Sequence, residues 1–262
     1  MMTDITDLLA AIVAATRTAV AFRELERPVG SLGRDHQPDG KGFAEALSGS
    51  ASPRIIAECK RRSPSRGILR QRYDPAAHAL AYAEAGAAAI SVLTEPAFFD
   101  GHPEHLAAVR RAVNLPVLRK DFIVTDYQVH ESVALGADAI LLIVGALDED
   151  ELTHLHELAL SLGLAALVEV HDRDELLRAL HAGARIVGVN SRNLRTLQVD
   201  LGVAERLSVD MPDEVIAVGE SGIRSGEDIR RLSALGYDAF LVGEQLITQE
   251  DPGDALRGLR SS

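Results

Sequence analysis

The stretch Leu135-Gly-Ala-Asp-Ala-Ile140 carries a pattern that returns along the chain. Related stretches, each with a glycine shortly before an apolar run, begin at Glu84, His181 and Leu235, at intervals of about 50 residues. Each is typical of a helix that ends in a left-handed glycine and is followed by a strand. Because about 50 residues accommodate two strand–helix units, the repeat marks every second strand.

Eight short apolar runs extend the pattern over most of the chain. They cover residues 55–59, 89–93, 116–118 leading to Phe122, 139–144, 165–170, 186–189, 215–218 and 239–242. The runs are continuous rather than alternating, as is typical of parallel strands covered on both faces. Eight strands alternating with helices in about 210 residues predict an α/β fold, a closed (β/α)8 TIM barrel. The alternative is an open doubly wound sheet, but no G-x-G-x-x-G motif follows the first run.

Three stretches between the runs have helical features. Residues 148–161 place leucines at three- and four-residue spacing, and residues 172–182 and 225–235 look similar. Each stretch opens with an Asp or Ser that suits a helix N-cap. We therefore predict helices over these three ranges.

The first 50 residues differ from the repeating part. Residues 6–26 have helical spacing, residues 29–40 contain three glycines and a proline and suit a loop, and residues 42–47 suit a short helix. This extension is too short to form a domain. We predict a single barrel domain over residues 1–262, with residues 1–50 packed on the barrel as a helical extension.

Composition limits the function classes. The net charge of −12 argues against nucleic acid, and no apolar run reaches the 18 residues that suggest a membrane span. The single cysteine excludes a disulfide framework, and the N-terminus lacks the basic segment of a secretory signal. We expect a cytoplasmic protein that acts as a monomer on a small anionic substrate, with pathway partners possible.

Acids and bases gather at the expected carboxyl ends of the strands, where barrel enzymes place their active sites. They are Glu58, Lys60, Lys120, Glu169 and Glu220, and the neutral amide Asn190 lies at another strand end. Side chains two residues apart in a strand share a face, so Lys120 lies with Leu118 and Glu169 with Leu167. Core leucines on the same face indicate that the charges point into the barrel.

The last two units carry a glycine directly after the strand, in Ser221-Gly222 and Gly243-Glu244. Glycines in these loops let a phosphate approach backbone amides, although a tight turn is the simpler reading of each one alone. A basic loop after the first strand contains six cations, which are either a phosphate-binding cluster or solvated charges. They are Lys60, Arg61, Arg62, Arg66, Arg70 and Arg72.

Six motifs together resemble one family. They are Glu58-Cys-Lys-Arg-Arg-Ser-Pro-Ser65, Leu118-Arg-Lys-Asp-Phe122, Glu169-Val-His171, Gly188-Val-Asn-Ser-Arg-Asn-Leu194, Glu220-Ser-Gly-Ile223 and Phe240-Leu-Val-Gly-Glu244. The chain resembles indole-3-glycerol phosphate synthase over nearly its whole length. The resemblance implies a lyase of tryptophan biosynthesis that closes the indole ring of 1-(2-carboxyphenylamino)-1-deoxyribulose 5-phosphate, with loss of carbon dioxide and water. No metal or organic cofactor is implied.

The resemblance also implies roles for the strand-end residues. Lys120 would be the general acid for ring closure, Lys60 would hold the substrate carboxylate or assist as an acid, and Glu169 would serve the dehydration. Glu58 would orient a lysine, and Asn190, Glu220 and Ser221 would contact the substrate. The phosphate would lie on Ser63, Arg192, Gly222, Gly243 and the backbone amide of Glu244. Which lysine protonates the leaving hydroxyl stays open.

Two other functions remain as alternatives. A barrel enzyme could use a lysine to form a Schiff base with a ketone phosphate. A barrel could also serve as a non-catalytic scaffold, but the strand-end lysines and glutamates are all present.

Four further side chains carry expectations. We expect Cys59 to be an inert thiol that faces the helices, and His171 to be solvated at the surface. Phe98 and Phe99, in the loop after the second strand, could contact the substrate ring or simply pack within their loop.

Overall fold

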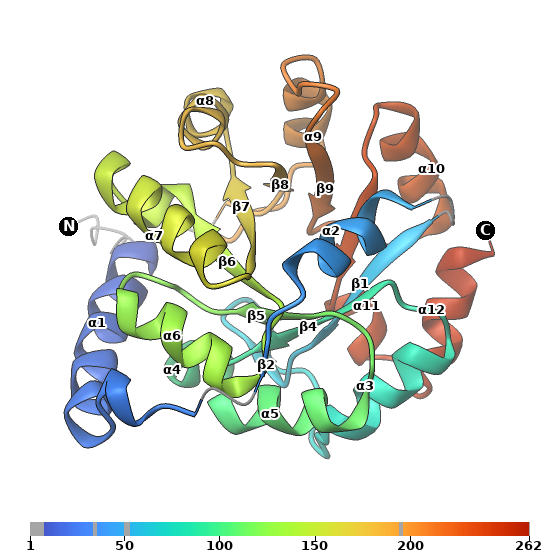
Figure 1. The fold of residues 1–262 in the computed structure, drawn as a ribbon. Helices are drawn as coiled ribbons and strands as arrows, with labels where there is room; N and C mark the ends of the chain where they lie inside the picture. Colours follow the sequence, from blue (N-terminus) through green and yellow to red (C-terminus); the bar gives the residue numbers. More distant parts are fainter. Residues whose placement is uncertain (1–7, 34–35, 50–52, 194–195, 262) are drawn as a thin grey trace, which may run out of the picture.

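Eight parallel strands close on themselves in the order β1-β10-β9-β8-β7-β6-β5-β4, with helices around them (Figure 1). The computed structural model describes residues 8–33, 36–49, 53–193 and 196–261. The barrel strands are β1 (Arg54–Cys59), β4 (Ala89–Leu93), β5 (Val117–Lys120), β6 (Ala139–Ile143), β7 (Ala165–Val170), β8 (Ile186–Asn190), β9 (Ile216–Glu220) and β10 (Ala239–Val242). The predicted closed barrel is confirmed, and the open sheet was the wrong alternative.

Three strands run further than the apolar residues indicated. β5 continues through Arg119 to Lys120, β8 reaches Asn190, and β9 reaches Glu220. Strand pairing continues there, since Leu93 pairs with Lys120 and Asn190 pairs with Glu220. The polar residues are therefore the last residues of the strands themselves, which fixes their side chains on rigid backbone.

Each barrel strand is followed by at least one helix. The helices are α3 (Pro75–Glu84), α4 (Pro96–Phe99), α5 (Pro103–Ala112), α6 (Asp126–Leu135), α7 (Glu149–Ser161), α8 (Arg173–His181), α9 (Gly202–Ser208), α10 (Gly226–Ala234), α11 (Glu244–Ile247) and α12 (Pro252–Arg260). The side chains of Asp148, Asp172 and Ser225 cap α7, α8 and α10, which confirms the three predicted helices. The loop after β1 folds into a small hairpin of β2 (Arg62–Ser63) and β3 (Gly67–Ile68).

The four repeated glycines have the predicted backbone conformation. Gly86, Gly136, Gly183 and Gly236 have φ angles of +86°, +92°, +86° and +94°. They precede β4, β6, β8 and β10, so the repeat does mark every second barrel strand. Gly163, with a φ angle of +81°, ends α7 before β7 in the same way, outside the repeat that we recognised.

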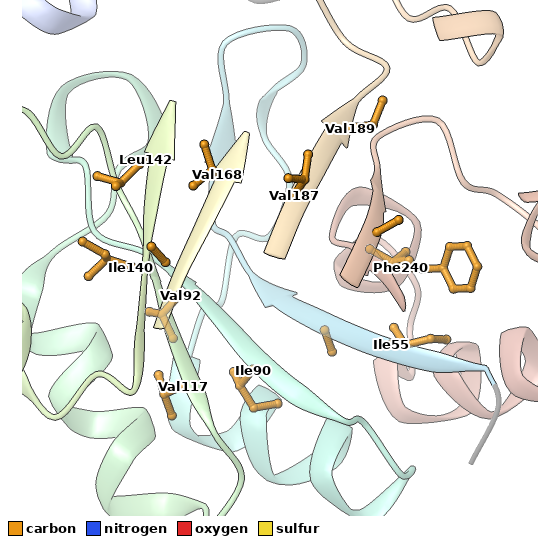
Figure 2. Close-up of a cluster of buried hydrophobic side chains, with 14 of the residues drawn as sticks. Ile55, Ile90, Val92, Val117, Ile140, Leu142, Val168, Val187, Val189 and Phe240 are labelled. Atoms are coloured by element: carbon orange, nitrogen blue, oxygen red, sulfur yellow. The ribbon is translucent and has the colours of Figure 1, made fainter. Parts of the chain in front are cut away.

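Alternating faces of the strands build two apolar layers. One face packs against the surrounding helices through residues such as Ile55, Ile90 and Val168 (Figure 2). The other face fills the barrel interior and includes Leu118 and Leu167. Lys120 and Glu169 share faces with these two leucines, as predicted, and therefore lie above the inner layer.

The N-terminal segment contributes two helices at different ends of the barrel. In α2 (Gly40–Ser48), the fully buried Phe43 and Leu47 belong to the interior layer, and Gly40 lies against the start of β7. α1 (Leu8–Glu26) packs against α6 and the short 3-10 helix η2 (Val144–Ala146). The predicted loop contains a second 3-10 helix, η1 (Val29–Ser31).

The predicted bounds of the extension fit only in part. α2 begins two residues before the predicted 42–47, because Asp39 caps it by accepting a hydrogen bond from the Gly42 amide. Residues 1–7, 34–35 and 50 of the extension lie outside the described residues, so the single-domain division stays a prediction. Among the described ranges, no helix has both the length and the apolar character needed to cross a bilayer.

Candidate active site

Lys120 lies between two glutamates at the carboxyl end of the barrel. Its Nζ donates to Glu169 Oε2 at 2.7 Å and to Glu220 Oε2 at 2.8 Å. Lys120 and Glu220 end β5 and β9, and Glu169 is the last but one residue of β7, so alternate strands of the barrel bring them together. Both carboxylates are almost completely buried, while the lysine side chain is 12% exposed. The lysine is thus the most exposed member of this cluster.

The electrostatics of the cluster keep the lysine charged. Burial lowers the pKa of Lys120, but the charges of Glu169, Glu220 and Glu58 outweigh burial and raise it above the ordinary value. Burial raises the pKa of Glu169, but the charges of Lys120 and His171 have a larger opposite effect, so the pKa lies below the ordinary value. Burial raises the pKa of Glu220, and the charge of Glu169 adds to this. The two carboxylates therefore differ, with Glu169 the more readily ionised.

Asn190 orients the more acidic of the two glutamates. Its side-chain amide donates to Glu169 Oε1 at 3.0 Å, and its carbonyl oxygen accepts from the backbone amide of Arg192 at 2.9 Å. Both oxygens of Glu169 are thereby engaged, one by Lys120 and one by Asn190. The carboxylate is held in one orientation before any ligand arrives.

Glu58 and Lys60 form the second charged pair, at the end of β1. Lys60 Nζ lies 2.5 Å from Glu58 Oε1, and the Lys60 side chain is 15% exposed. Gly243 packs directly against the Glu58 carboxylate, where a β-carbon would collide with Oε1. This glycine therefore makes room for a strand-end acid, in addition to its position in the loop after β10.

Glu220 depends on a glycine in the same way. A β-carbon on Gly188, in the neighbouring strand β8, would collide with Glu220 Oε1. The glycine was seen in the sequence only as part of a motif. The structure shows that the missing side chain gives space to a buried carboxylate.

Ser221 and Gly222 follow β9 in a left-handed backbone conformation. Their φ angles are +62° and +80°, and Ser221 is one of few residues other than glycine in this region among those described. Such a conformation is costly for a residue with a β-carbon and is concentrated at functional sites. The turn directs both residues into the same cavity as Lys120.

Arg192 and Glu244 join the loops after β8 and β10 to the loop after β1. Arg192 Nη1 donates to Ser65 Oγ at 3.4 Å, and its Nη2 lies 3.7 Å from Glu244 Oε2. Arg66 Nε lies 3.1 Å from Glu244 Oε1. Two arginines therefore flank one carboxylate, which leaves a net positive charge beside Ser63 and Ser65.

All of the predicted site residues line one cavity of about 360 Å³. The charged cluster around Lys120 forms one part of its lining. Ser63, Ser65, Arg66 and Arg192 form another part, which we call the basic end. The predicted residues in the lining are Glu58, Lys60, Ser63, Lys120, Glu169, Asn190, Arg192, Glu220, Ser221, Gly222, Gly243 and Glu244. We call this cavity the Lys120 pocket.

The apolar wall of the Lys120 pocket is only partly predictable from the sequence. Phe99 and Phe122 line it and lie near each other, with ring centroids 6.1 Å apart. Leu8 and Ile12 of α1 also line it, so the N-terminal helix is part of the site. The helical spacing of α1 predicted packing on the barrel but gave no signal that it reached the pocket.

The expectation for Cys59 is confirmed and that for His171 is wrong. Cys59 is buried among the helix-facing residues, and burial raises the pKa of its thiol. His171 is only 17% exposed, with Nδ1 3.0 Å from Glu175 Oε2 and Nε2 3.5 Å from Glu169 Oε1. The residue follows β7 directly, and α8 covers it, so it is not solvated at the surface.

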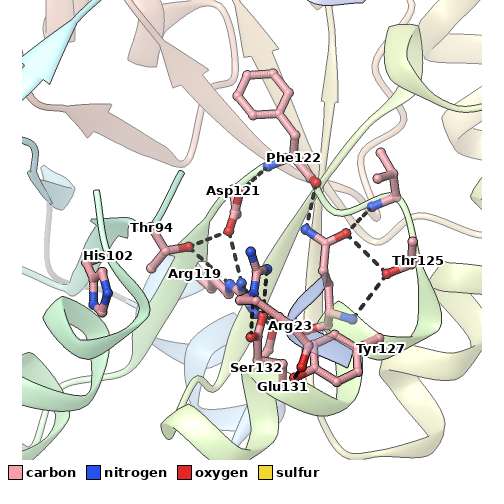
Figure 3. A network of polar contacts seen from close by, with 12 residues as sticks. Arg23, Thr94, His102, Arg119, Asp121, Phe122, Thr125, Tyr127, Glu131 and Ser132 are labelled. Atoms are coloured by element: carbon pink, nitrogen blue, oxygen red, sulfur yellow. Dashed lines mark hydrogen bonds and ion pairs between the residues drawn. The ribbon is translucent and has the colours of Figure 1, made fainter. Parts of the chain in front are cut away.

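A buried arginine on the outer face of β5 supports the site from behind (Figure 3). Arg119 is fully buried and ion-paired with Asp121 at 3.0 Å and with Glu131 at 2.7 Å. Glu131 also binds Arg23 of α1 at 3.0 Å. Asp121 accepts from Thr94 at 2.6 Å and from the backbone amide of Phe122. This network ties β4, β5, α6 and α1 together around the residue next to Lys120.

The basic loop after β1 is held by partners along much of its length. Arg61 pairs with Asp100, and Arg70 donates to the backbone carbonyls of Gln249 and Glu250. Arg66 pairs with Glu244, as described above. The loop is therefore fastened across the pocket rather than freely solvated.

The described residues contain no group of three or more His, Cys, Asp or Glu side chains that could hold a metal ion. His154 and His156 face different ways on α7, because they are two residues apart on a helix. His154 is exposed and pairs with Asp126, whereas His156 is buried.

Residues 9–259 match the family model of indole-3-glycerol phosphate synthase. The chain belongs to the indole-3-glycerol phosphate synthase family. The resemblance inferred from the motifs is thus confirmed. Members of this family are carboxy-lyases.

Curated members of the indole-3-glycerol phosphate synthase family agree over almost the whole length. The one from Parafrankia sp. (strain EAN1pec) is 51% identical over 245 residues, which cover 92% of this chain and 90% of that protein. The one from Sulfurimonas denitrificans is 44% identical over 258 residues, which cover 97% of this chain and 98% of that protein.

Solved structures outside the indole-3-glycerol phosphate synthase family share the fold. A thiamine phosphate pyrophosphorylase from Pyrococcus furiosus matches with a TM-score of 0.60 at 20% identity, covering 79% of this chain and 94% of that one. An N-acetylmannosamine-6-phosphate 2-epimerase from Clostridium perfringens matches with a TM-score of 0.58 at 16% identity. The match covers 73% of this chain and 86% of that one. These similarities show the barrel and nothing about the reaction.

Proposed function

We propose that the chain carries out the reaction of its family in the Lys120 pocket. The substrate is 1-(2-carboxyphenylamino)-1-deoxyribulose 5-phosphate and the product is indole-3-glycerol phosphate. The observation that carries the proposal is the position of Lys120, a charged lysine held between two buried carboxylates in a cavity with a basic end. A reaction that adds protons to a ketone oxygen needs such a donor.

The reaction takes up two protons and releases one. The ring carbon that bears the carboxylate attacks the ketone carbon, and the ketone oxygen takes up a proton. The carboxylate then leaves as carbon dioxide, which restores the aromatic ring. The new hydroxyl takes up a second proton and leaves as water, while the CH₂ group next to nitrogen gives up one proton. Each turnover therefore takes one proton from solvent.

Lys120 is the general acid for ring closure in this scheme. Its raised pKa keeps it protonated, and the alkoxide that develops on the substrate is a stronger base than an amine. The ammonium also stabilises the developing negative charge. A Schiff base would require the neutral amine, which the surrounding carboxylates disfavour.

Glu169 is the base that takes the carbon-bound proton during dehydration. It is the more readily ionised of the two glutamates, and Asn190 fixes its orientation. Lys60, with Glu58 as its counter-ion, holds the substrate carboxylate or delivers the second proton. Lys120 lies between Glu169 and Glu220, and Glu220 and Ser221 contact the substrate on their side of the lysine.

The basic end of the pocket holds the phosphate. Arg192 and the Ser63 hydroxyl supply side-chain donors, and the loops of Gly222, Gly243 and Glu244 supply backbone amides. The Glu244 side chain already pairs with Arg66 and Arg192, so only its backbone serves the phosphate. The aromatic ring of the substrate lies against the apolar wall, which includes Phe99 and Ile12.

The number of chains that act together and the cellular location complete the proposal. The twelve residues of the site come from one chain, which is compatible with an enzyme that acts as a monomer. Its place is the cytoplasm, which the single cysteine and the biosynthetic role of the family favour.

The direct test uses purified protein and the synthetic carboxyphenylamino-deoxyribulose phosphate. We expect indole fluorescence to rise with time, with one carbon dioxide released for each indole formed. Treatment with borohydride during turnover should leave no substrate attached to the protein. Absence of both indole and carbon dioxide would refute the function, and a trapped adduct on Lys120 would favour the Schiff-base alternative.

A further inference from the structure

His171 lies behind Glu169, on the side away from the Lys120 pocket. It follows β7 by one residue and does not line the cavity, whereas Glu169 does. Its Nε2 is buried, has no hydrogen-bond partner within the described ranges, and lies 3.5 Å from Glu169 Oε1. An unpaired buried ring nitrogen next to a candidate base calls for a physical reason.

Glu175, in the first turn of α8, fixes which nitrogen of the ring carries hydrogen. Its Oε2 accepts from the backbone amide of His171 at 2.7 Å and lies 3.0 Å from Nδ1. A carboxylate can only accept, so Nδ1 carries the hydrogen. Nε2 is therefore the nitrogen that gains or loses a proton, and it is the one that faces Glu169.

We propose that His171, clamped by Glu175, is a positioning residue that keeps Glu169 ionised and oriented as the base of the dehydration step. When Nε2 is protonated, its positive charge faces Glu169 Oε1 and stabilises the carboxylate. When Nε2 is not protonated, its lone pair faces the same oxygen and opposes the carboxylate. The inference rests on the proposed function, because it assigns Glu169 the task of taking up a proton.

The charges around His171 favour the protonated ring. Burial lowers the pKa of His171, but the hydrogen bond that the ring donates to Glu175 and the charges of Glu169 and Glu220 raise it. Lys120 lies beyond Glu169 and is neutralised by the two glutamates it binds. Arg178, one turn along α8 from Glu175, directs its guanidinium at the carbonyls of Val144 and Leu147 instead.

The kinetic test is the pH dependence of kcat/KM for the wild type, His171→Gln and Glu175→Gln. An opposite charge within a few ångströms shifts the pKa of a carboxyl by about one unit or more. Loss of that charge in His171→Gln should therefore move the acid limb to higher pH, with kcat/KM roughly tenfold lower on that limb. Glu175→Gln keeps the ring, which stays protonated at the low pH of this limb, so the limb should move much less than in His171→Gln.

The matched control is His154→Gln. His154 also pairs with an acid, Asp126, but it is 60% exposed on the surface of α7. This variant should leave the acid limb unchanged. A purely structural role of His171 would lower kcat/KM by one factor at every pH, so an unshifted limb in His171→Gln would overturn the proposal.

A second measurement needs neither turnover nor a His171 variant. Nitrogen-15 spectra of labelled histidines distinguish the two neutral tautomers, and the resonance that responds to Glu175→Gln identifies His171. We expect hydrogen on Nδ1 after deprotonation, and a neutral ring with hydrogen on Nε2 would refute the clamp. A wild type without indole formation would instead refute the proposed function and leave this measurement able to decide the geometry.

Discussion

Lys120 and Glu169 stand 49 residues apart in the sequence, yet their charged atoms lie 2.7 Å apart at the mouth of the barrel. Neither residue can be changed without affecting the other, because both are largely withdrawn from water. Two kinds of effect follow from a substitution here, one on the chemistry and one on the buried charge that is left behind.

Lys120→Met should abolish most turnover while substrate binding is largely retained. Loss of a general acid typically lowers the rate by about 10²- to 10⁴-fold. The variant also leaves Glu169 and Glu220 without their shared cation, so at least one of them should take up a proton. Single-turnover fluorescence and a binding titration check this, with the exposed Lys41→Met as control. Wild-type-like turnover in Lys120→Met would exclude the lysine as the acid.

Gly188→Ala should impair catalysis through Glu220, although residue 188 is outside the set that lines the pocket. The new methyl group would collide with Glu220 Oε1, and overpacking of this kind costs about 1–3 kcal/mol. We expect kcat to fall, together with a lower melting temperature. Gly30→Ala is the matched control, since a β-carbon there meets no atom within 4 Å. Normal kcat in Gly188→Ala would show that the position of Glu220 is not critical.

Arg192→Met should weaken binding more than it slows the chemistry. A hydrogen bond to a charged group contributes about 1.5–3 kcal/mol, which corresponds to roughly 10- to 100-fold in affinity. KM should rise by that order while kcat changes little. The same substitution should have almost no effect on a substrate analogue without phosphate. Equal losses for both ligands would place the phosphate elsewhere. Arg206→Met, on an exposed arginine that pairs with Asp200, serves as control.

Arg119→Met should destabilise the protein strongly. The guanidinium is fully buried and neutralises Asp121 and Glu131, and breaking a buried ion pair by removing one partner costs about 3–5 kcal/mol. Denaturant unfolding monitored by circular dichroism measures the loss. Arg173→Met removes an exposed pair with Asp210 and should change the stability little. A small effect in Arg119→Met would mean that the network is not a source of stability.

Glu131 should make stability depend on pH in the acid range. Burial raises the pKa of its carboxyl, but the charges and hydrogen bonds of Arg119 and Arg23 lower it below the ordinary value. The unfolded chain then binds a proton more readily, so the free energy of unfolding decreases as pH falls from about 4.3 through the folded pKa. Glu131→Gln should flatten this acid slope. An equally steep slope in that variant would assign the acid sensitivity to other carboxylates.

The parts of the fold that were predictable depended on short-range signals. Apolar runs, N-caps such as Asp148 and left-handed glycines such as Gly136 act within a few residues, and each was placed correctly. Strand ends were less predictable, because Arg119 and Glu220 are charged yet continue their strands. Their partners lie on other strands and helices, and no local pattern shows that the charges will be satisfied.

In the site, too, positions that depend on neighbouring residues were predictable, and positions that depend on distant partners were not. Alternation in β5 and β7 was enough to direct Lys120 and Glu169 inward, next to Leu118 and Leu167. His171 was expected in solvent, because nothing in the sequence shows that α8 and Glu175 cover it. Arg119 could have been suspected, since the alternation that turns Lys120 inward turns its neighbour towards the helices.

The position of α1 has a consequence for the order in which the protein can form. Arg17 contacts the backbone of Val124, and Arg23 contacts Glu131, across separations of 107 and 108 residues. During synthesis α1 therefore leaves the ribosome long before its docking surface exists. The helix that carries Leu8 and Ile12 must wait, with its apolar face uncovered, until the middle of the barrel has been made. The first described helix in the chain can thus add its part of the wall of the Lys120 pocket only after the middle of the chain has been synthesised.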